Sequence, residues 1–265
     1  MPSKAEERLR FETFVVGAGN RAAVLAVTSV AEHVGRSDSP LVITGSIGTG
    51  KTHLLRALRH FVAGRFPGRP HLVLDPLTLE AIAASPAGRA DLLQQAQRAF
   101  LITLDDLSLI EGKSAANRLL ARVLDAGELS QIVLTADRPV EQLTGLGASV
   151  LSRLAAGVEV AMDPPDLQLR AALVRAAAIE YGATLTDAAM DEIARFAITD
   201  VRQLFGYVRR LVTTQRFQVM VEPTRRTEHL ERASEGFEDL LVFADPEKIV
   251  WDWPEMSARL VEDLD

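Results

Sequence analysis

The sequence predicts an α/β protein in which a parallel sheet of five strands is followed by a small helical domain. Three observations predict this class. Short apolar segments alternate with segments of helical periodicity, a Pro-Pro pair ends the alternation, and purely helical patterns follow the pair. The chain has 265 residues, of which 48% are hydrophobic and 25% charged, so it holds enough apolar material for about two domains.

The predicted strands are short runs of aliphatic and β-branched residues. They lie at 41–44, 72–74, 100–104, 131–135 and 157–162. Strands that are joined through helices run parallel and are buried on both faces, which requires such continuous apolar runs. The fifth run ends at Asp163-Pro164-Pro165, and a Pro-Pro pair neither continues a strand nor lies inside a helix. We therefore expect the first domain at residues 1–163.

The second predicted domain, a helical one, comprises residues 164–216. Its three segments carry apolar residues at three- and four-residue spacing, and each begins with Asp at or beside a position suited to a helix N-cap. They lie at 166–181, 187–197 and 200–214.

An acidic C-terminal tail is predicted at residues 217–265. Between Glu228 and Asp265 there are twelve Asp and Glu against three Lys and Arg, so the net charge of −7 resides in the tail. The preceding residues are mildly basic, which neither requires nor excludes contact with nucleic acid. Large apolar side chains, Trp251 and Trp253 among them, lie between the carboxylates. The tail either packs on the core or docks on a partner.

Composition excludes several classes of protein. No apolar run approaches the ~20 residues that cross a bilayer, and the N-terminus is charged, so we expect a cytoplasmic protein without a membrane partner. The chain has no cysteine, which excludes disulfides and thiolate metal sites. Any metal would be bound by oxygen or histidine.

A phosphate-binding loop follows the first predicted strand and precedes an amphipathic segment. Its sequence fits G-x-x-x-x-G-K-[ST], in which glycines allow a tight turn and backbone N–H groups face phosphates. The lysine reaches the outer phosphates, and the last residue ligates Mg²⁺. The residues expected to bind the nucleotide are Gly45, Ser46, Ile47, Gly48, Thr49, Gly50, Lys51 and Thr52.

Two carboxylates end the third predicted strand. Because the carboxyl ends of parallel strands meet at one edge of the sheet, Asp105 and Asp106 are expected to face the phosphates. Asp105 would hold the Mg²⁺ shell, and Asp106 would orient or deprotonate the attacking water. The alternative is a solvated turn with no catalytic role.

At this point the sequence resembles the DnaA/Hda-type AAA+ ATPases of bacterial replication. The resemblance covers about residues 10–212. It rests on segments spread along this range. They are residues 11–17 with Asn20-Arg21, the phosphate-binding loop with residues 52–55, Asp105-Asp106, residues 132–139 (sensor 1), residues 151–153 (arginine-finger box), residues 163–167 (hinge) and residues 200–204 (sensor 2). It implies an AAA+ base domain with a helical lid, and ATP with Mg²⁺ as the ligand.

The resemblance also implies roles for single residues. Val15, Val16 and Asn20 would border the adenine, and His53 would continue the nucleotide-binding segment. The remaining implied roles all concern the phosphates: Asp137 would sense the γ-phosphate or position water, Arg202 of the lid would contact the same nucleotide, and Arg153 would reach the ATP of a neighbouring subunit.

Three features depart from the family pattern. Ser149 stands where the arginine-finger box usually carries a second Arg. The segment 84–97, which in the family lines a path for single-stranded DNA, offers only Arg89. Counterparts of the C-terminal helix-turn-helix and the N-terminal helicase-recruiting domain are not found. We therefore expect DNA binding to be weak or indirect.

The function expected from the sequence is a slowly hydrolysing ATP switch that regulates replication initiation. Its partner would be a copy of itself, a DnaA-family AAA+ protein or another replication factor. One alternative is a non-replicative adaptor that works through the tail. Another is a metabolic kinase, which would not need Arg153 and Arg202 at these places.

Overall fold

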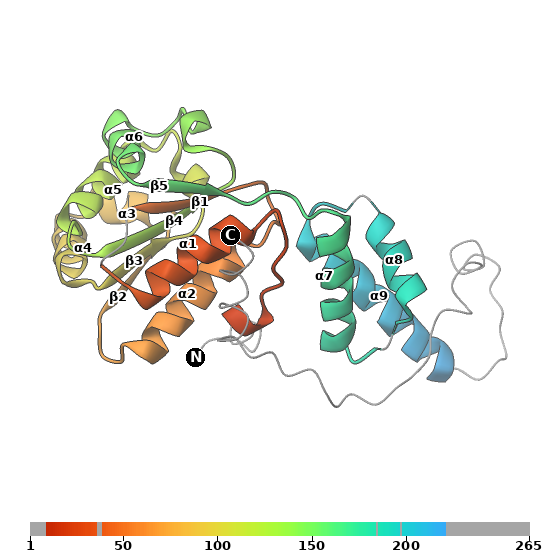
Figure 1. The fold of residues 1–265 in the computed structure, drawn as a ribbon. Helices are drawn as coiled ribbons and strands as arrows, with labels where there is room; N and C mark the ends of the chain where they lie inside the picture. The colour runs from red at the N-terminus through yellow and green to blue at the C-terminus, as the bar shows by residue number, and fades with distance from the viewer. Residues whose placement is uncertain (1–8, 36–38, 184, 197, 221–265) are drawn as a thin grey trace. The chain divides into compact units, whose positions relative to one another are not determined.

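The computed structural model describes residues 9–35, 39–183, 185–196 and 198–220, with side chains up to Thr213. This part of the chain forms two compact units that divide between Asp163 and Pro164 (Figure 1). From residue 221 on, the expected acidic tail lies outside the described residues, as do Trp251 and Trp253.

The first unit contains a five-stranded parallel sheet with the strand order β2-β3-β4-β1-β5. The strands are β1 (Leu41–Thr44), β2 (His71–Leu74), β3 (Leu101–Leu104), β4 (Gln131–Ala136) and β5 (Val158–Ala161). The predicted fold class is thus confirmed, and each strand begins and ends within one residue of its expected bounds. The bounds were predictable because the inner strands are buried on both faces.

Helices cover both faces of the sheet (Figure 1). On one face lie α1 (Arg21–Glu32) and α2 (Lys51–Arg65), and on the other lie α3 (Leu79–Ala84), α4 (Pro86–Arg98), α5 (Ser114–Ala126) and α6 (Ala148–Ala155). A hydrophobic core lies on each face of the sheet, and successive residues of a strand point into opposite cores. Ile43 packs toward α1 and α2, whereas its neighbour Val42 packs toward α5.

The connections at the carboxyl edge of the sheet position the site. β1 continues through the phosphate-binding loop into α2, β3 into the 3₁₀ helix η2 (Leu107–Ile110), and β4 into η3 (Val140–Gln142). Because β4 pairs with both β1 and β3, the ends of these three strands are neighbours. The crevice outside the carboxyl ends is where open α/β sheets bind ligands.

Gly157, just before β5, supports a stability prediction. A Cβ atom there would lie 2.0 Å from the Pro40 carbonyl oxygen, which already accepts a 2.9 Å hydrogen bond from the Val158 N–H. The carbonyl group and the ring of Pro40 leave no room for a side chain, so Gly157→Ala should lower the free energy of unfolding by about 2 kcal/mol or more. Gly64→Ala is the matched control, because that site in α2 is open and the exchange raises helix propensity. Urea unfolding of both variants measures the difference, and equal stabilities would contradict the packing described here.

The second unit is a bundle of α7 (Leu167–Glu180), α8 (Asp187–Arg195) and α9 (Val201–Met220). The side chain of Asp166 caps α7 by accepting from the Leu169 N–H at 2.7 Å, as the sequence suggests. In α8 the cap is Thr186, and Asp187 lies beside it as the first residue of the helix, as the sequence suggests. α9 continues to Met220, past residue 214, where the third helical segment was expected to end, and past residue 216, the expected end of the domain. No helix in the described part of the chain is long and apolar enough to span a bilayer.

Candidate nucleotide-binding site

The phosphate-binding loop has the backbone that its glycines predict. Gly45, Gly48 and Gly50 have φ of 149°, 82° and 106°, a region that other residues rarely adopt. A Cβ on Gly45 would lie 2.3 Å from the Met162 carbonyl oxygen, so the chain also requires a glycine there on packing grounds. Gly50 directly precedes α2, and the first N–H groups of that helix therefore lie at the loop.

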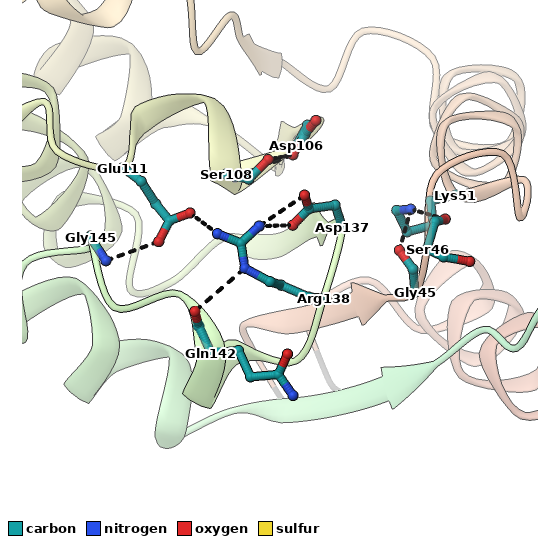
Figure 2. A network of polar contacts seen from close by, with 10 residues as sticks. All are labelled: Gly45, Ser46, Lys51, Asp106, Ser108, Glu111, Asp137, Arg138, Gln142 and Gly145. Carbon is teal, nitrogen blue, oxygen red and sulfur yellow. Dashed lines mark hydrogen bonds and ion pairs between the residues drawn. The ribbon is translucent and has the colours of Figure 1, made fainter.

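Lys51 lies inside this loop. Its Nζ donates to the carbonyl oxygens of Gly45 at 2.6 Å and of Ser46 at 2.8 Å, and the residue is only 9% exposed (Figure 2). The hydroxyl of Thr49 donates to the Ser46 carbonyl at 3.0 Å and closes the turn. The Ile47 side chain is 65% exposed, so this position would serve through its backbone. A buried ammonium beside several N–H groups suits an anion such as a phosphate chain.

The two carboxylates that end β3 are held by a threonine of the neighbouring strand. The hydroxyl of Thr135, which is fully buried in β4, donates to Oδ1 of Asp105 at 2.7 Å. The same hydroxyl oxygen accepts from the backbone N–H of Asp106 at 2.8 Å. Thr135 thus orients the proposed Mg²⁺ ligand and the start of the next turn together.

Asp106 has an unusual backbone. Its φ is 71°, the only positive φ of a non-glycine residue in the described part of the chain. Its Oδ1 accepts from the backbone N–H of Ser108 at 3.2 Å and from the Ser108 hydroxyl, so the side chain caps η2 (Figure 2). Asp tolerates this backbone region because its short side chain bonds locally. Backbone strain of this kind is characteristic of functional sites.

The expected sensor residue Asp137 follows β4. Both of its oxygens accept from Nη1 of Arg138, at 2.7 and 2.9 Å, and Arg138 also pairs with Glu111 (Figure 2). The sheet order brings Asp137 to the same edge as the phosphate-binding loop and Asp105.

The segment expected to border the adenine is fixed by Asn20. The buried Asn20 amide donates to the Val15 carbonyl at 3.0 Å and accepts from the Gly17 N–H at 2.8 Å. Its amide therefore shapes the loop that presents Val15 and Val16, both of which are partly exposed. The implied role of Asn20 as a direct reader of the base stays a prediction.

His53 anchors the segment before that loop to α2. Its Nε2 lies 2.9 Å from the Arg10 carbonyl oxygen and 3.3 Å from the Thr13 hydroxyl, and its ring contacts Phe14 edge-on. Phe14 in turn is the atom group nearest to a Cβ built on Gly50. His53 thus links α2 to residues 10–14, which precede Val15 and Val16.

Arg153 forms an ion pair with a residue of its own chain. Its Nε and Nη2 bind Oδ1 and Oδ2 of Asp125 in α5, both at 2.5 Å, and its Nη1 donates to the Ser149 carbonyl at 2.5 Å. The hydrogen bond from Arg153 holds the pKa of Asp125 below its ordinary value. The carboxylate therefore stays ionised above about pH 4, and the contribution of the pair to stability is lost only as pH falls below that.

Two expected ligands remain predictions. Arg202 lies in the second unit, where its backbone N–H donates to Asp200 at 2.8 Å and its side chain is 76% exposed. Thr52 is the second residue of α2, directly after Lys51. The described residues contain no group of three His, Asp or Glu that could form a metal site by themselves. Mg²⁺ would therefore depend on Thr52, Asp105, water and the phosphates, as is common for this ion.

Comparison with known proteins decides the family. The model of the bacterial DnaA ATPase domain matches residues 5–161, which includes the whole carboxyl edge described above. The chain belongs to the bacterial DnaA ATPase domain family. The sheet and the helices that follow it therefore form an AAA+ base domain with a helical lid.

Individual DnaA proteins agree with this assignment. The chain is 34% identical to the replication initiator DnaA of Thermus thermophilus over 217 residues, which are 79% of this chain and 49% of that protein. It thus spans about half the length of the DnaA proteins that it matches. Domain III of Thermotoga maritima DnaA superposes with a TM-score of 0.72 at 25% identity, covering 80% of this chain and 90% of that one. A DnaA bound to AMPPCP and single-stranded DNA has the same fold, with a TM-score of 0.72 at 24% identity and coverages of 85% and 67%.

Several residues around the site were not predicted from the sequence. Thr135, Glu111 and Arg138 orient the carboxylates, and Asp125 binds Arg153. Thr135 offers a faint signal, since it is a hydroxyl residue near the end of an apolar strand and lies within the sensor 1 segment, residues 132–139. The others become visible only when distant segments are brought together.

Proposed function

We propose that this DnaA-family chain is an ATP-dependent switch that acts in, or regulates, the initiation of DNA replication. It would bind ATP with Mg²⁺, hydrolyse it slowly, and differ between nucleotide states in its affinity for a copy of itself or another DnaA-family protein. Arg202 of the lid and Arg153 would sense the nucleotide from within the chain and from a neighbouring subunit.

One observation carries the proposal. The phosphate-binding loop, the Asp105–Asp106 pair and Asp137 follow three neighbouring strands, β1, β3 and β4, and so share one edge of the sheet. Phosphate binding alone would require only the phosphate-binding loop. Carboxylates for the metal and the water at the same edge provide what hydrolysis requires. The family match argues against the metabolic-kinase alternative.

DNA contact through the segment that joins β2 to β3 receives little support. Arg89, the one arginine of residues 84–97, donates from Nη1 to the Ala83 carbonyl at 2.5 Å, which ties it to the end of α3. We therefore propose that any contact with single-stranded DNA is weak or is made through an assembled partner.

The test is to measure the oligomeric state of the protein in each nucleotide-bound state. The purified chain, alone and with a DnaA protein, is examined by sedimentation with ATP, ADP or no nucleotide, and retention of single-stranded and duplex DNA is measured in parallel. We expect larger assemblies with ATP than with ADP. A chain that phosphorylates a metabolite, and whose assembly ignores the nucleotide, would overturn the proposal.

The Arg153–Asp125 pair supplies a sharper prediction. Arg153→Ala should remove most of the ATP dependence of assembly, since it removes the charge that would meet the neighbour's phosphates. Asp125→Asn is the matched variant: it weakens the pair within the subunit and leaves Arg153 in place, so ATP-dependent assembly should persist or strengthen. In sedimentation, Arg153→Ala should therefore reduce the ATP-dependent assembly, whereas Asp125→Asn should preserve or increase it. Equal loss in both variants would mean that the pair matters only for the fold of α5 and α6.

A further inference from the structure

Arg138 connects three parts of the base domain (Figure 2). Its Nη1 holds both oxygens of Asp137, its Nη2 pairs with Glu111, and its Nε donates to the Gln142 carbonyl at 3.4 Å. The side chains of Glu111, Asp137 and Arg138 are 17%, 24% and 37% exposed, so the ion pairs are partly shielded from water. One planar guanidinium thereby fixes the directions of two carboxylates.

Glu111 extends the connection to the turn before α6. Its second oxygen accepts from the Gly145 N–H at 2.9 Å, and the Gly145 carbonyl accepts from the Gly112 N–H at 2.9 Å. A Cβ on Gly145 would lie 2.8 Å from the Cβ of Glu111, so the two turns approach as closely as a glycine allows. Buried Asn117 adds a third bond by accepting from the Gly147 N–H at 2.8 Å.

The arrangement bears on the chemistry of Asp137. A carboxylate without a cationic partner would be repelled by a nearby triphosphate, and the positive charge of Arg138 offsets this repulsion. The hydrogen bonds from Arg138 also hold the Asp137 side chain in one rotamer. Each carboxylate oxygen has two lone pairs. Asp137 can therefore accept from Arg138 and still accept a hydrogen bond from a water molecule at the phosphates.

We propose that Arg138, held in place by Glu111, is a positioning residue for ATP hydrolysis. It holds the carboxylate of Asp137 in one rotamer at the edge of the sheet that carries the phosphate-binding loop, and it ties that carboxylate to the turn that leads into α6, the helix of Arg153. This inference rests on the proposed function, because it assigns a part in the hydrolysis proposed there.

The experiment separates binding from turnover. ATP affinity is measured with a fluorescent ATP analogue, and hydrolysis in single turnover with Mg²⁺, for the wild type, Arg138→Ala, Asp137→Asn and the double variant. Arg138→Ala should change affinity by less than about 3-fold and slow hydrolysis by roughly 10-fold or more, since a small displacement of a positioned group costs that much. The double variant should be no slower than Asp137→Asn alone, because both changes remove the same interaction.

Two conservative variants test whether slower hydrolysis could result from unfolding of the protein. Arg138→Lys keeps the charge but not the planar fork, and Glu111→Gln keeps the bond from Gly145 but not the charge. Both should slow hydrolysis with little change in the melting temperature. Arg175→Ala is the control, since it breaks an exposed pair with Asp187 in the lid (3.1 Å) and should leave hydrolysis unchanged.

The outcomes distinguish this inference from the proposed function. A wild type that neither binds nor hydrolyses ATP overturns both. If the wild type hydrolyses ATP while the Arg138 and Glu111 variants keep its rate, or if the double variant shows the product of the two single defects, only the positioning role is overturned.

Discussion

Replacement of Lys51 by alanine is expected to weaken ATP binding by at least about 100-fold. The ammonium is nearly buried and is bonded to the Gly45 and Ser46 carbonyls, from which it would turn to the phosphates. Each hydrogen bond from a charged donor contributes about 1.5–3 kcal/mol, and about 1.4 kcal/mol is a factor of ten, so two such bonds account for the loss. Calorimetric titration with ATP and Mg²⁺ measures it.

The control for Lys51→Ala lies on the same helix. Arg65 is exposed in the last turn of α2, where it stacks on Phe66, and at 1.5 Å per residue it is roughly 20 Å from Lys51. Arg65→Ala removes an equal charge and should leave ATP affinity within about 2-fold, because charges at that distance are screened. If Lys51→Ala binds ATP as tightly as the wild type, the nucleotide site has been misplaced.

Asp106→Asn should leave ATP binding nearly intact and slow hydrolysis by roughly 100-fold, the usual contribution of a general base. Asparagine keeps the Oδ1 atom that caps η2 and tolerates the φ of 71° as well as aspartate does. The substitution therefore removes the charge and the basicity without breaking the turn. Single-turnover hydrolysis, compared with affinity for the same nucleotide, isolates the chemical step.

Ser108→Ala is the structural counterpart of that variant. It removes the hydroxyl that donates to Asp106 and leaves the carboxylate charged, so hydrolysis should fall by less than about 10-fold. Hydrolysis that persists unchanged in Asp106→Asn would place the activation of water elsewhere, with Asp137 the next residue to replace.

The sequence by itself determined the fold of the base domain and the residues at its carboxyl edge. Buried parallel strands require continuous apolar runs, so the five strands and the Asp163–Pro165 break could be located from local pattern. The phosphate-binding loop is equally local, because its glycines, lysine and threonine act through the backbone of one turn. Asp105 and Asp106 follow from the rule that parallel strands end at one edge, whereas Asp137 was implied by the family resemblance.

Only the tertiary structure decided what holds these residues. Thr135 lies thirty residues from Asp105, Glu111 twenty-seven from Arg138, and Asp125 twenty-eight from Arg153, and no periodicity links positions so far apart. Those pairs depend on the order in which β3, β4 and their turns are placed side by side. The hydrogen bonds of Asn20 to Val15 and Gly17 also appear only in the structure, and its implied role as a reader of the base stays a prediction. Side-chain pairing is set by the packing of the whole domain, and a single strand or turn does not encode it.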